Sequence, residues 1–205
     1  SDLDHAGFVM QLWRLSDLRL LKTVTLPVPP GARANIDRNP YEVRKTKAGE
    51  ILLSTGAGGL YRISGLDPDV FRAELVFDFG AGAYLPVIVD RYWIQAVSSL
   101  RRVVALDVSN ARKPFEISRV QFDDRQAPRW LGLDERSNRI VVANGNGDSE
   151  ARLWMLRMDP MSGLLSFDST FHDPGNDRPG VSFEREQWPH GATGRGVPHG
   201  SVFVQ

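Results

Sequence analysis

Short apolar segments separated by Gly, Pro, Asn and Asp run along the whole chain. No segment keeps an apolar period of 3.6 residues for more than about two helical turns, so long amphipathic helices are not expected. Runs of strand length between turn-forming residues are instead typical of β-structure. The pattern therefore predicts an all-β protein.

A unit of strand, polar turn and strand occurs four times. The expected first strands are residues 8–15, 60–63, 103–108 and 153–158, and the expected second strands are residues 20–26, 74–79, 115–122 and 164–171. A period of roughly 40–50 residues indicates the blades of a β-propeller. A β-sandwich of unrelated hairpins is the alternative, but a sandwich requires no such period.

Three of these units follow another pair of apolar runs. The expected pairs are residues 42–44 with 51–54, 86–89 with 92–97, and 130–133 with 140–144. Four strands per period predict four-stranded antiparallel blades, which must stack because one blade cannot bury both of its faces. The nearly continuous Val, Ile and Leu of the inner strands fit burial on both faces.

About four blades are visible in the sequence, and the chain begins inside the first of them, at Phe8. We expect residues 1–205 to form a single propeller domain or the C-terminal part of one, with a closing tail rich in Gly and Pro at 172–205. Strands at 181–183 and 201–204 are candidates to complete the blade of residues 8–26. The result is a four-bladed ring or part of a seven-bladed ring, which needs roughly 300 residues. Another chain or a missing segment is a further candidate to complete the ring.

The charge balance narrows the classes of partner. The 25 basic and 25 acidic residues cancel, which argues against nucleic-acid binding through bulk charge. No apolar run reaches the ~18 residues of a membrane span. The absence of cysteine excludes disulfides and thiolate chemistry. A soluble protein is expected, whether cytoplasmic, periplasmic or secreted.

Several short motifs resemble known propeller families. NRIVVAN at 138–144 and LDVSNARKP at 106–114 resemble YVTN-type repeats, and DPMSG at 159–163 resembles a turn of lactonase-like propellers. WPHG at 188–191, VPHGSVF at 197–203 and the opening SDLDHAG resemble bacterial relatives of the selenium-binding-protein propellers. That resemblance implies the C-terminal portion of a longer ring, mostly seven-bladed in the family. Some of its members are copper-dependent thiol oxidases with histidines near the central channel, and this chain carries Arg129 where a histidine ligand could stand.

The histidines are the candidate metal ligands. His190 and His199 lie in similar Pro-His-Gly frames, where proline fixes the chain before the ring and glycine lets it turn afterwards. His5 is a third candidate if the chain ends meet. Imidazole binds copper and zinc, so these three residues form a candidate site for either metal. The alternative is that they are loop histidines bonded to backbone or water.

Arg129, Trp188 and Arg195 are the candidate ligand-binding residues, because the two arginines lie in connections that can line a channel mouth and Trp188 is the aromatic candidate in the tail rich in Gly and Pro. We expect Trp13, Trp93, Trp130 and Trp154 to pack between blades. Asn144 begins a segment with alternating oxygen ligands that could bind calcium, although an Asn-Gly turn explains it as well.

The functional hypothesis is a small-molecule or metal-binding propeller with its site on the central channel, because a channel gathers a loop from each blade. Two other classes stay open. One is a non-catalytic propeller that binds a protein on its rim, and the other is a lactonase-like hydrolase. No Gly-x-Ser-x-Gly nucleophile motif is present.

Overall fold

The computed structural model describes residues 7–28, 39–144, 150–192 and 194–203. Almost all regular structure in these ranges is β-strand, and the one helical element within them is the 3₁₀ turn η1 (Ser98–Leu100). No helix in the described part is long and apolar enough to cross a membrane. The prediction of an all-β protein is confirmed.

Three antiparallel sheets follow one another along the described chain, each built on four strands in sequence order, and the third also takes up a short fifth strand described below. Blade I contains β3 (Pro40–Lys45), β4 (Ile51–Thr55), β5 (Gly59–Ser64) and β6 (Arg72–Asp78). Blade II contains β7 (Ala83–Val89), β8 (Tyr92–Val97), β9 (Arg102–Asp107) and β10 (Phe115–Gln121). Blade III contains β11 (Pro128–Asp134), β12 (Arg139–Asn144), β13 (Arg152–Met158) and β14 (Leu165–Phe167).

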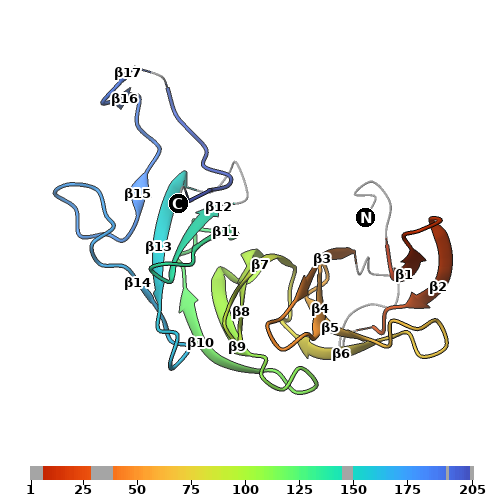
Figure 1. Ribbon diagram of the computed structural model, residues 1–205. Helices are drawn as coiled ribbons and strands as arrows, with labels where there is room; N and C mark the ends of the chain where they lie inside the picture. Colours follow the sequence, from red (N-terminus) through yellow and green to blue (C-terminus); the bar gives the residue numbers. More distant parts are fainter. Residues whose placement is uncertain (1–6, 29–38, 145–149, 193, 204–205) are drawn as a thin grey trace.

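The blades stand side by side along an open arc (Figure 1). The first strand of each blade lies on the concave side, and the last strand lies on the convex side. An N-terminal hairpin of β1 (Val9–Arg14) and β2 (Arg19–Thr25) stands at one end of the arc as an outer pair without inner strands of its own among the described residues. The chain is thus a β-propeller of four-stranded blades whose ring is not closed.

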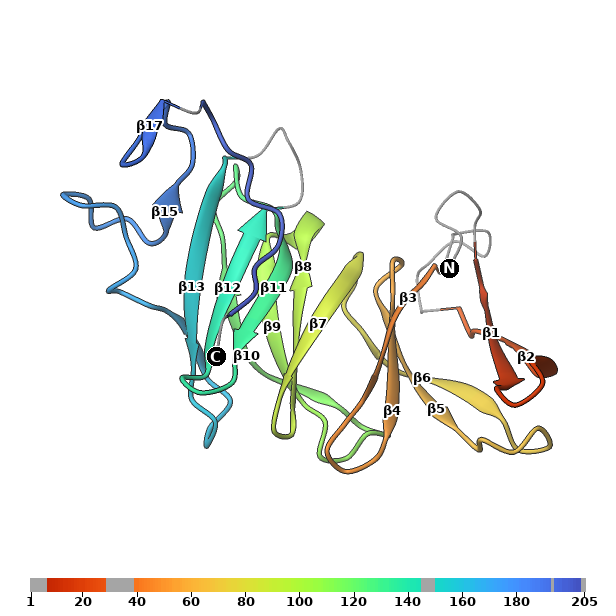
Figure 2. The same ribbon diagram turned by 45° about the horizontal axis from the view of Figure 1, so that its top comes forward.

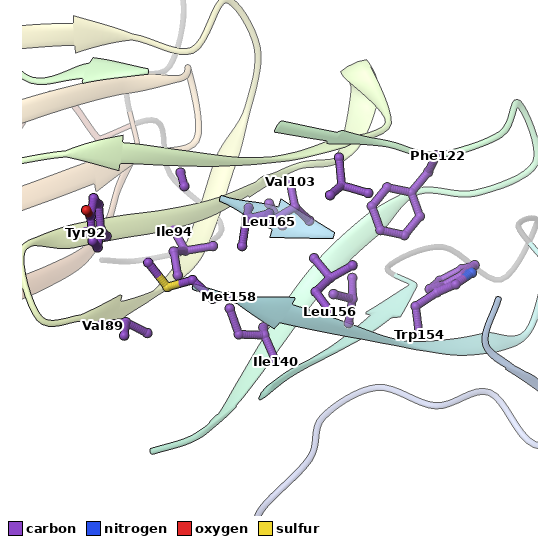
Figure 3. Packing of buried hydrophobic residues seen from close by; sticks show 14 residues of the cluster. Val89, Tyr92, Ile94, Val103, Phe122, Ile140, Trp154, Leu156, Met158 and Leu165 are labelled. Carbon is purple, nitrogen blue, oxygen red and sulfur yellow. The ribbon is translucent and has the colours of Figure 1, made fainter. Parts of the chain in front are cut away.

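The hydrophobic core lies between neighbouring blades rather than inside one sheet. Between blades II and III, Tyr92, Ile94 and Val103 face Ile140, Leu156 and Met158 (Figure 3). Phe122 and Trp154 meet edge to face in the same cluster, with ring centroids 5.1 Å apart. Two further clusters join blade I to blade II and the N-terminal hairpin to blade I. This stacking is what four-stranded blades need, because each face is covered only by a neighbour.

The expectation that four tryptophans pack between blades holds for some of them and not for others. Trp93 and Trp154 are 0% and 1% exposed, which confirms their packing in the core. Trp130 is half-buried. The prediction for Trp13 is wrong, because this side chain is 46% exposed. Its hairpin lies at the end of the arc, where no described blade covers one of its faces.

The C-terminal tail takes a different route from the predicted one. Residues 181–183 were expected beside the N-terminal hairpin, but β15 (Val181–Ser182) pairs with Arg152 and Leu153 of β13. It can do so because β14 pairs only with Leu156–Met158 and leaves the rest of that edge open. Gly180 permits the approach, since a Cβ there would lie 2.4 Å from the Leu153 carbonyl oxygen.

The rest of the tail forms a small hairpin and then returns to blade III. The hairpin contains β16 (Gln187–Trp188) and β17 (Gly191–Ala192). The chain then runs back over blade III (Figure 2), where Ser201 lies against Gly132 of β11. The tail residues described therefore cover blade III instead of completing the first blade.

Candidate functional site

A pocket of about 480 Å³ opens where blades I, II and III meet near their innermost strands. Its walls come from the β4–β5 turn, the start of β7, η1, the loop before β11 and the start of β11. The lining residues are Gly56, Gly82, Tyr84, Ser98, Ser99, Arg101, Asp124, Arg125, Gln126, Ala127 and Arg129. We call this the axial pocket.

Each innermost strand begins with a β-bulge. The register of β3 skips Tyr41, that of β11 skips Arg129, and that of β7 skips Tyr84 and Leu85. A bulge leaves a residue outside the ladder and re-aims its side chain. The three blades thus present Tyr41, Tyr84 and Arg129 from equivalent positions of their first strands.

These three side chains form a continuous row, which we call the axial row. The rings of Tyr41 and Tyr84 meet edge to face at 5.2 Å, with an angle of 82°. The guanidinium carbon of Arg129 lies 4.5 Å from the centroid of the Tyr84 ring. A cation held over an aromatic ring at this distance is attracted by the ring quadrupole. The row therefore joins one residue from each complete blade.

Arg129 holds its charge without a protein counter-ion in the described part of the chain. No carboxylate there forms an ion pair with it, and its Nε is buried without a hydrogen-bond partner among those residues. The Tyr84 hydroxyl likewise has no described hydrogen-bond partner, and it lies 3.4 Å from the position of a Cβ on Gly82. Because a guanidinium stays charged and carries five N–H donors, Arg129 has donors free for a ligand.

A buried polar network fixes the bulge at Tyr84. The Tyr84 carbonyl oxygen accepts hydrogen bonds from Ser54 Oγ and Gln95 Nε2, each 3.0 Å long. Trp93 Nε1 in turn donates to Gln95 Oε1 at 3.0 Å. These donors lie in the core and are fully satisfied, so the network holds one geometry. Blades I and II together therefore position the ring on which Arg129 rests.

Asn144 fixes the loop that forms the opposite wall. Its Oδ1 accepts the backbone N–H of Ala127 at 2.8 Å, and its Nδ2 donates to the Glu150 carbonyl. The Glu150 N–H donates to the Arg125 carbonyl at 3.0 Å. Both ends of this buried amide are thus used to hold the backbone. The other residues of the calcium alternative, Asn146 and Asp148, lie outside the described ranges.

The axial pocket carries an excess of positive charge. Arg101, Arg125 and Arg129 line it together with a single carboxylate, that of Asp124. Asp124 pairs with Arg101 at 3.1 Å, and its side chain is 91% exposed. An ion pair open to water contributes little and leaves the field of Arg125 and Arg129 unbalanced.

The other predicted ligand residues lie in the tail. Trp188 packs on Phe183 with ring centroids 5.1 Å apart, and the Arg185 guanidinium lies 4.6 Å from the Trp188 centroid. The Trp188 indole N–H donates to the Gly194 carbonyl at 3.0 Å. Arg195 follows in the exposed segment after this cluster. Neither residue lines the axial pocket.

The two described candidate metal ligands contact different tryptophans. The ring of His190 stacks near Trp188 at 6.3 Å, whereas that of His199 lies 4.3 Å from Trp130, next to Arg129. His5 lies outside the described residues. Among those that are described, no group of three or more His, Asp or Glu side chains could hold a metal ion. The copper or zinc site of His5, His190 and His199 stays a prediction.

A buried ion-pair network fastens the tail to blade III, and the sequence did not reveal it. Arg152, which is 4% exposed, donates to Glu150 at 3.1 Å and to the Gly180 carbonyl at 2.6 Å. Arg178 donates to both Glu150 oxygens, at 2.8 and 2.7 Å, and its Nη2 lies 3.5 Å from Asp123. Burial alone would raise the pKa of Glu150, but the hydrogen bonds from Arg152 and Arg178 outweigh it and lower the pKa. The network also braces Asp123, at the start of the pocket loop.

The chain is similar to several solved structures at low sequence identity. A hypothetical selenium-binding protein from Sulfolobus tokodaii aligns with a TM-score of 0.62 and 18% identity, over 80% of this chain and 46% of that one. A protein from Lactobacillus plantarum aligns with a TM-score of 0.59 and 14% identity, over 82% of this chain and 48% of that one. A putative 6-phosphogluconolactonase from Bacteroides uniformis aligns with a TM-score of 0.58 and 12% identity, over 77% and 49%.

No protein-family model and no curated protein sequence matches the chain. The chain spans about half the length of the solved structures it resembles. At these identities the likeness concerns the fold alone. It agrees with the blade architecture and supports the conclusion that the chain is an arc of a β-propeller.

Proposed function

We propose that this protein is a small-molecule-binding β-propeller whose site is the axial pocket. The observation that carries the proposal is the Arg129 guanidinium, which lies over Tyr84 beside the pocket without a counter-ion among the described residues. A pocket of about 480 Å³ is within the range of small-molecule sites, roughly 300–1,000 Å³. The structural likeness to a hypothetical selenium-binding protein supports a small-molecule role.

The walls of the pocket are built to keep their shape. The Tyr84 bulge is held by Ser54 and Gln95, the loop before β11 by Asn144, and η1 by the Ser98 hydroxyl, which donates to the Pro128 carbonyl at 2.6 Å. A pre-formed site loses less conformational entropy when a ligand binds. The same rigidity would also suit a ligand that carries a metal ion. Of the predicted metal ligands, His199 is the one whose ring contacts Trp130, the residue that follows Arg129 in the sequence.

A pocket-filling variant tests this function. Ser99 lines the pocket and is exposed, so Ser99→Trp should occupy the space without disturbing the core. A collection of organic acids, sugars, sugar phosphates, amino acids and nucleosides is screened for compounds that raise the melting temperature of the full chain. We expect at least one compound that stabilises the wild-type protein and loses this effect in Ser99→Trp.

The matched control is Ser16→Trp, which places the same ring on the exposed turn of the N-terminal hairpin. This control should respond to the compound as the wild-type protein does. If no compound stabilises the wild-type protein, or if every stabilising compound acts equally on Ser99→Trp, the axial pocket is not the binding site.

A further inference from the structure

We infer that the axial pocket selects small organic anions and that Arg129 is the residue that grips their carboxylate or phosphate group. This inference rests on the proposed function and adds the class of ligand. It follows from the charge of the pocket, the state of Arg129 and the rigidity of its support.

The state of Arg129 differs from that of most comparably buried arginines, and Arg102, which also has no described ion pair, donates instead to the Phe79 carbonyl at 2.9 Å. Arg62, Arg152 and Arg178 each have a carboxylate oxygen within 3.1 Å. Arg129 is half-buried like Arg62 and Arg178, yet no described carboxylate neutralises it. A partly buried charge without a partner is costly, and an anionic ligand would remove that cost. The pocket is therefore complementary to a negative charge.

The contact with Tyr84 leaves Arg129 suited to bind two oxygens of one anion in a bidentate manner. A ring face stabilises the guanidinium charge, but it provides no oxygen acceptor for the N–H groups. A guanidinium presents its donors in a planar fork that matches two oxygens of a carboxylate or phosphate. Because Ser54 and Gln95 hold the Tyr84 backbone carbonyl, the backbone that carries the ring beneath the guanidinium is fixed before the ligand arrives.

Other groups in the pocket complete an anion site. Arg125 is a second guanidinium without a described ion pair, and the Tyr84 hydroxyl is a free donor at the Gly82 side. Asp124 is the one carboxylate in the lining, and Arg101 neutralises it at 3.1 Å. The lining thus contains two unpaired cations and no unpaired anion. A cationic ligand would meet repulsion there.

The test compares charged and neutral probes by calorimetry on the full chain. The probes are sodium benzoate, inorganic phosphate and the neutral amide benzamide. We expect benzoate or phosphate to bind the wild-type protein and benzamide to bind at least tenfold more weakly. Arg129→Gln should weaken anion binding by roughly ten- to hundredfold, because charge-assisted hydrogen bonds are lost. The anion that binds with the higher affinity shows whether the site prefers a carboxylate or a phosphate.

Two further variants keep the test sharp. Arg129→Lys preserves the charge but removes the fork, so it should bind anions with an affinity between those of the wild-type protein and Arg129→Gln. Arg19→Gln removes an exposed charge that has no described ion pair, on β2 of the N-terminal hairpin, and it should leave binding unchanged. Circular dichroism and melting curves confirm that each variant is folded.

The outcomes separate this inference from the proposed function. Anion affinity that is equal in Arg129→Gln and in the wild-type protein overturns the role of Arg129. If neither anion binds while neutral compounds bind in a manner sensitive to Ser99→Trp, the pocket is a small-molecule site without anion selectivity. If Ser99→Trp changes the binding of no compound, the proposed function fails and the inference fails with it.

Discussion

Asp168 shows how a single residue joins two strands of blade III to the segment that follows β14. Its Oδ1 accepts the backbone N–H and the hydroxyl of Thr170, at 3.0 and 2.7 Å. Its Oδ2 lies 2.8 Å from Arg139 Nη2 and 3.2 Å from Arg157 Nε, so both guanidinium groups form ion pairs with it. The backbone N–H of Asp168 donates to the Met155 carbonyl. The residue thus connects β12, β13 and the chain after β14.

The surroundings of Asp168 set its pKa. Burial alone would raise the pKa, but the hydrogen bonds from Thr170 and Arg157 and the charge of Arg139 outweigh it, and the pKa falls from 3.8 to about 2. A carboxyl whose pKa is lower in the folded state than in the unfolded state stabilises the fold above the unfolded pKa. This contribution is lost as the pH falls through about 2.

Asp168→Asn should therefore lower the free energy of unfolding at pH 7 by on the order of 1–3 kcal/mol, because two guanidinium groups lose their counter-ion. The difference from the wild-type protein should shrink as the pH falls from about 4 towards 2, where the wild-type carboxyl also becomes protonated. Urea unfolding at pH 7, 4 and 3 measures this. Asp177→Asn, an exposed control in the tail, should change stability little at any pH. A constant difference across the pH range would contradict the role of the charge.

At the scale of strands, burial depends on which blade stands beside a residue. Trp154 on β13 packs on Phe122 at the end of blade II, whereas Trp13 on β1, in the hairpin at the end of the arc, is half exposed. Both tryptophans lie in strands of similar apolar pattern, so local sequence does not distinguish them. This is why burial was predicted correctly for Trp154 and wrongly for Trp13.

Trp154→Ala should lower the free energy of unfolding by on the order of 3–5 kcal/mol, because it leaves a cavity between two blades. The matched substitution Trp13→Ala should cost less than about 1 kcal/mol, since half of that ring already contacts solvent. Denaturant melts of both variants measure the difference. Equal losses would mean that the interface between blades II and III is no more important than the exposed hairpin.

Strand positions could be predicted from the sequence, but the bulges could not. The continuous apolar runs of β4, β8 and β12 follow from burial on both faces, and the structure confirms these strands. A bulge depends on the register between two strands, which local composition does not encode. The visible sign is a proline at the start of β3 and β11, which an edge strand tolerates. Arg129 was predicted as a candidate ligand-binding residue from its place in a connection, whereas Tyr84, Tyr41 and Arg125 were not singled out.

At the scale of the whole molecule, the two ends of the arc differ. The far edge of β13 is closed by β14 and β15, and the tail covers part of β11. At the other end, β1 pairs with β2 on one side and with no described strand on the other. Such an edge exposes unpaired backbone N–H and carbonyl groups. The route of the tail could not be predicted, because it depends on tertiary contacts of Arg178 and Gly180 with Glu150 and Arg152 that local composition does not encode.

We expect the open edge of β1 to accept a strand from a second copy when the chain is alone in solution. Because Leu26 donates to the Phe8 carbonyl, the alternation of an antiparallel pair places the backbone groups of Gln11 on the open edge. Gln11→Pro should remove a donor there without breaking the pairing to β2. In sedimentation experiments the wild-type mass should rise with protein concentration, and that of Gln11→Pro should not. A wild-type protein that stays monomeric at all concentrations would contradict this expectation.

The bulges at the start of β3, β7 and β11 give the three blades a similar backbone geometry at the proposed site, whatever side chain each bulge carries. One repeated backbone irregularity places a residue outside the ladder in each blade, and that residue is a tyrosine in blades I and II and an arginine in blade III. If the axial pocket binds a ligand as proposed, exchanging one of these side chains should alter the ligand preference while leaving the inter-blade core unchanged. In an arc built in this way, a substitution at one bulge changes one side chain of the proposed site and leaves the strands of the other blades as they are.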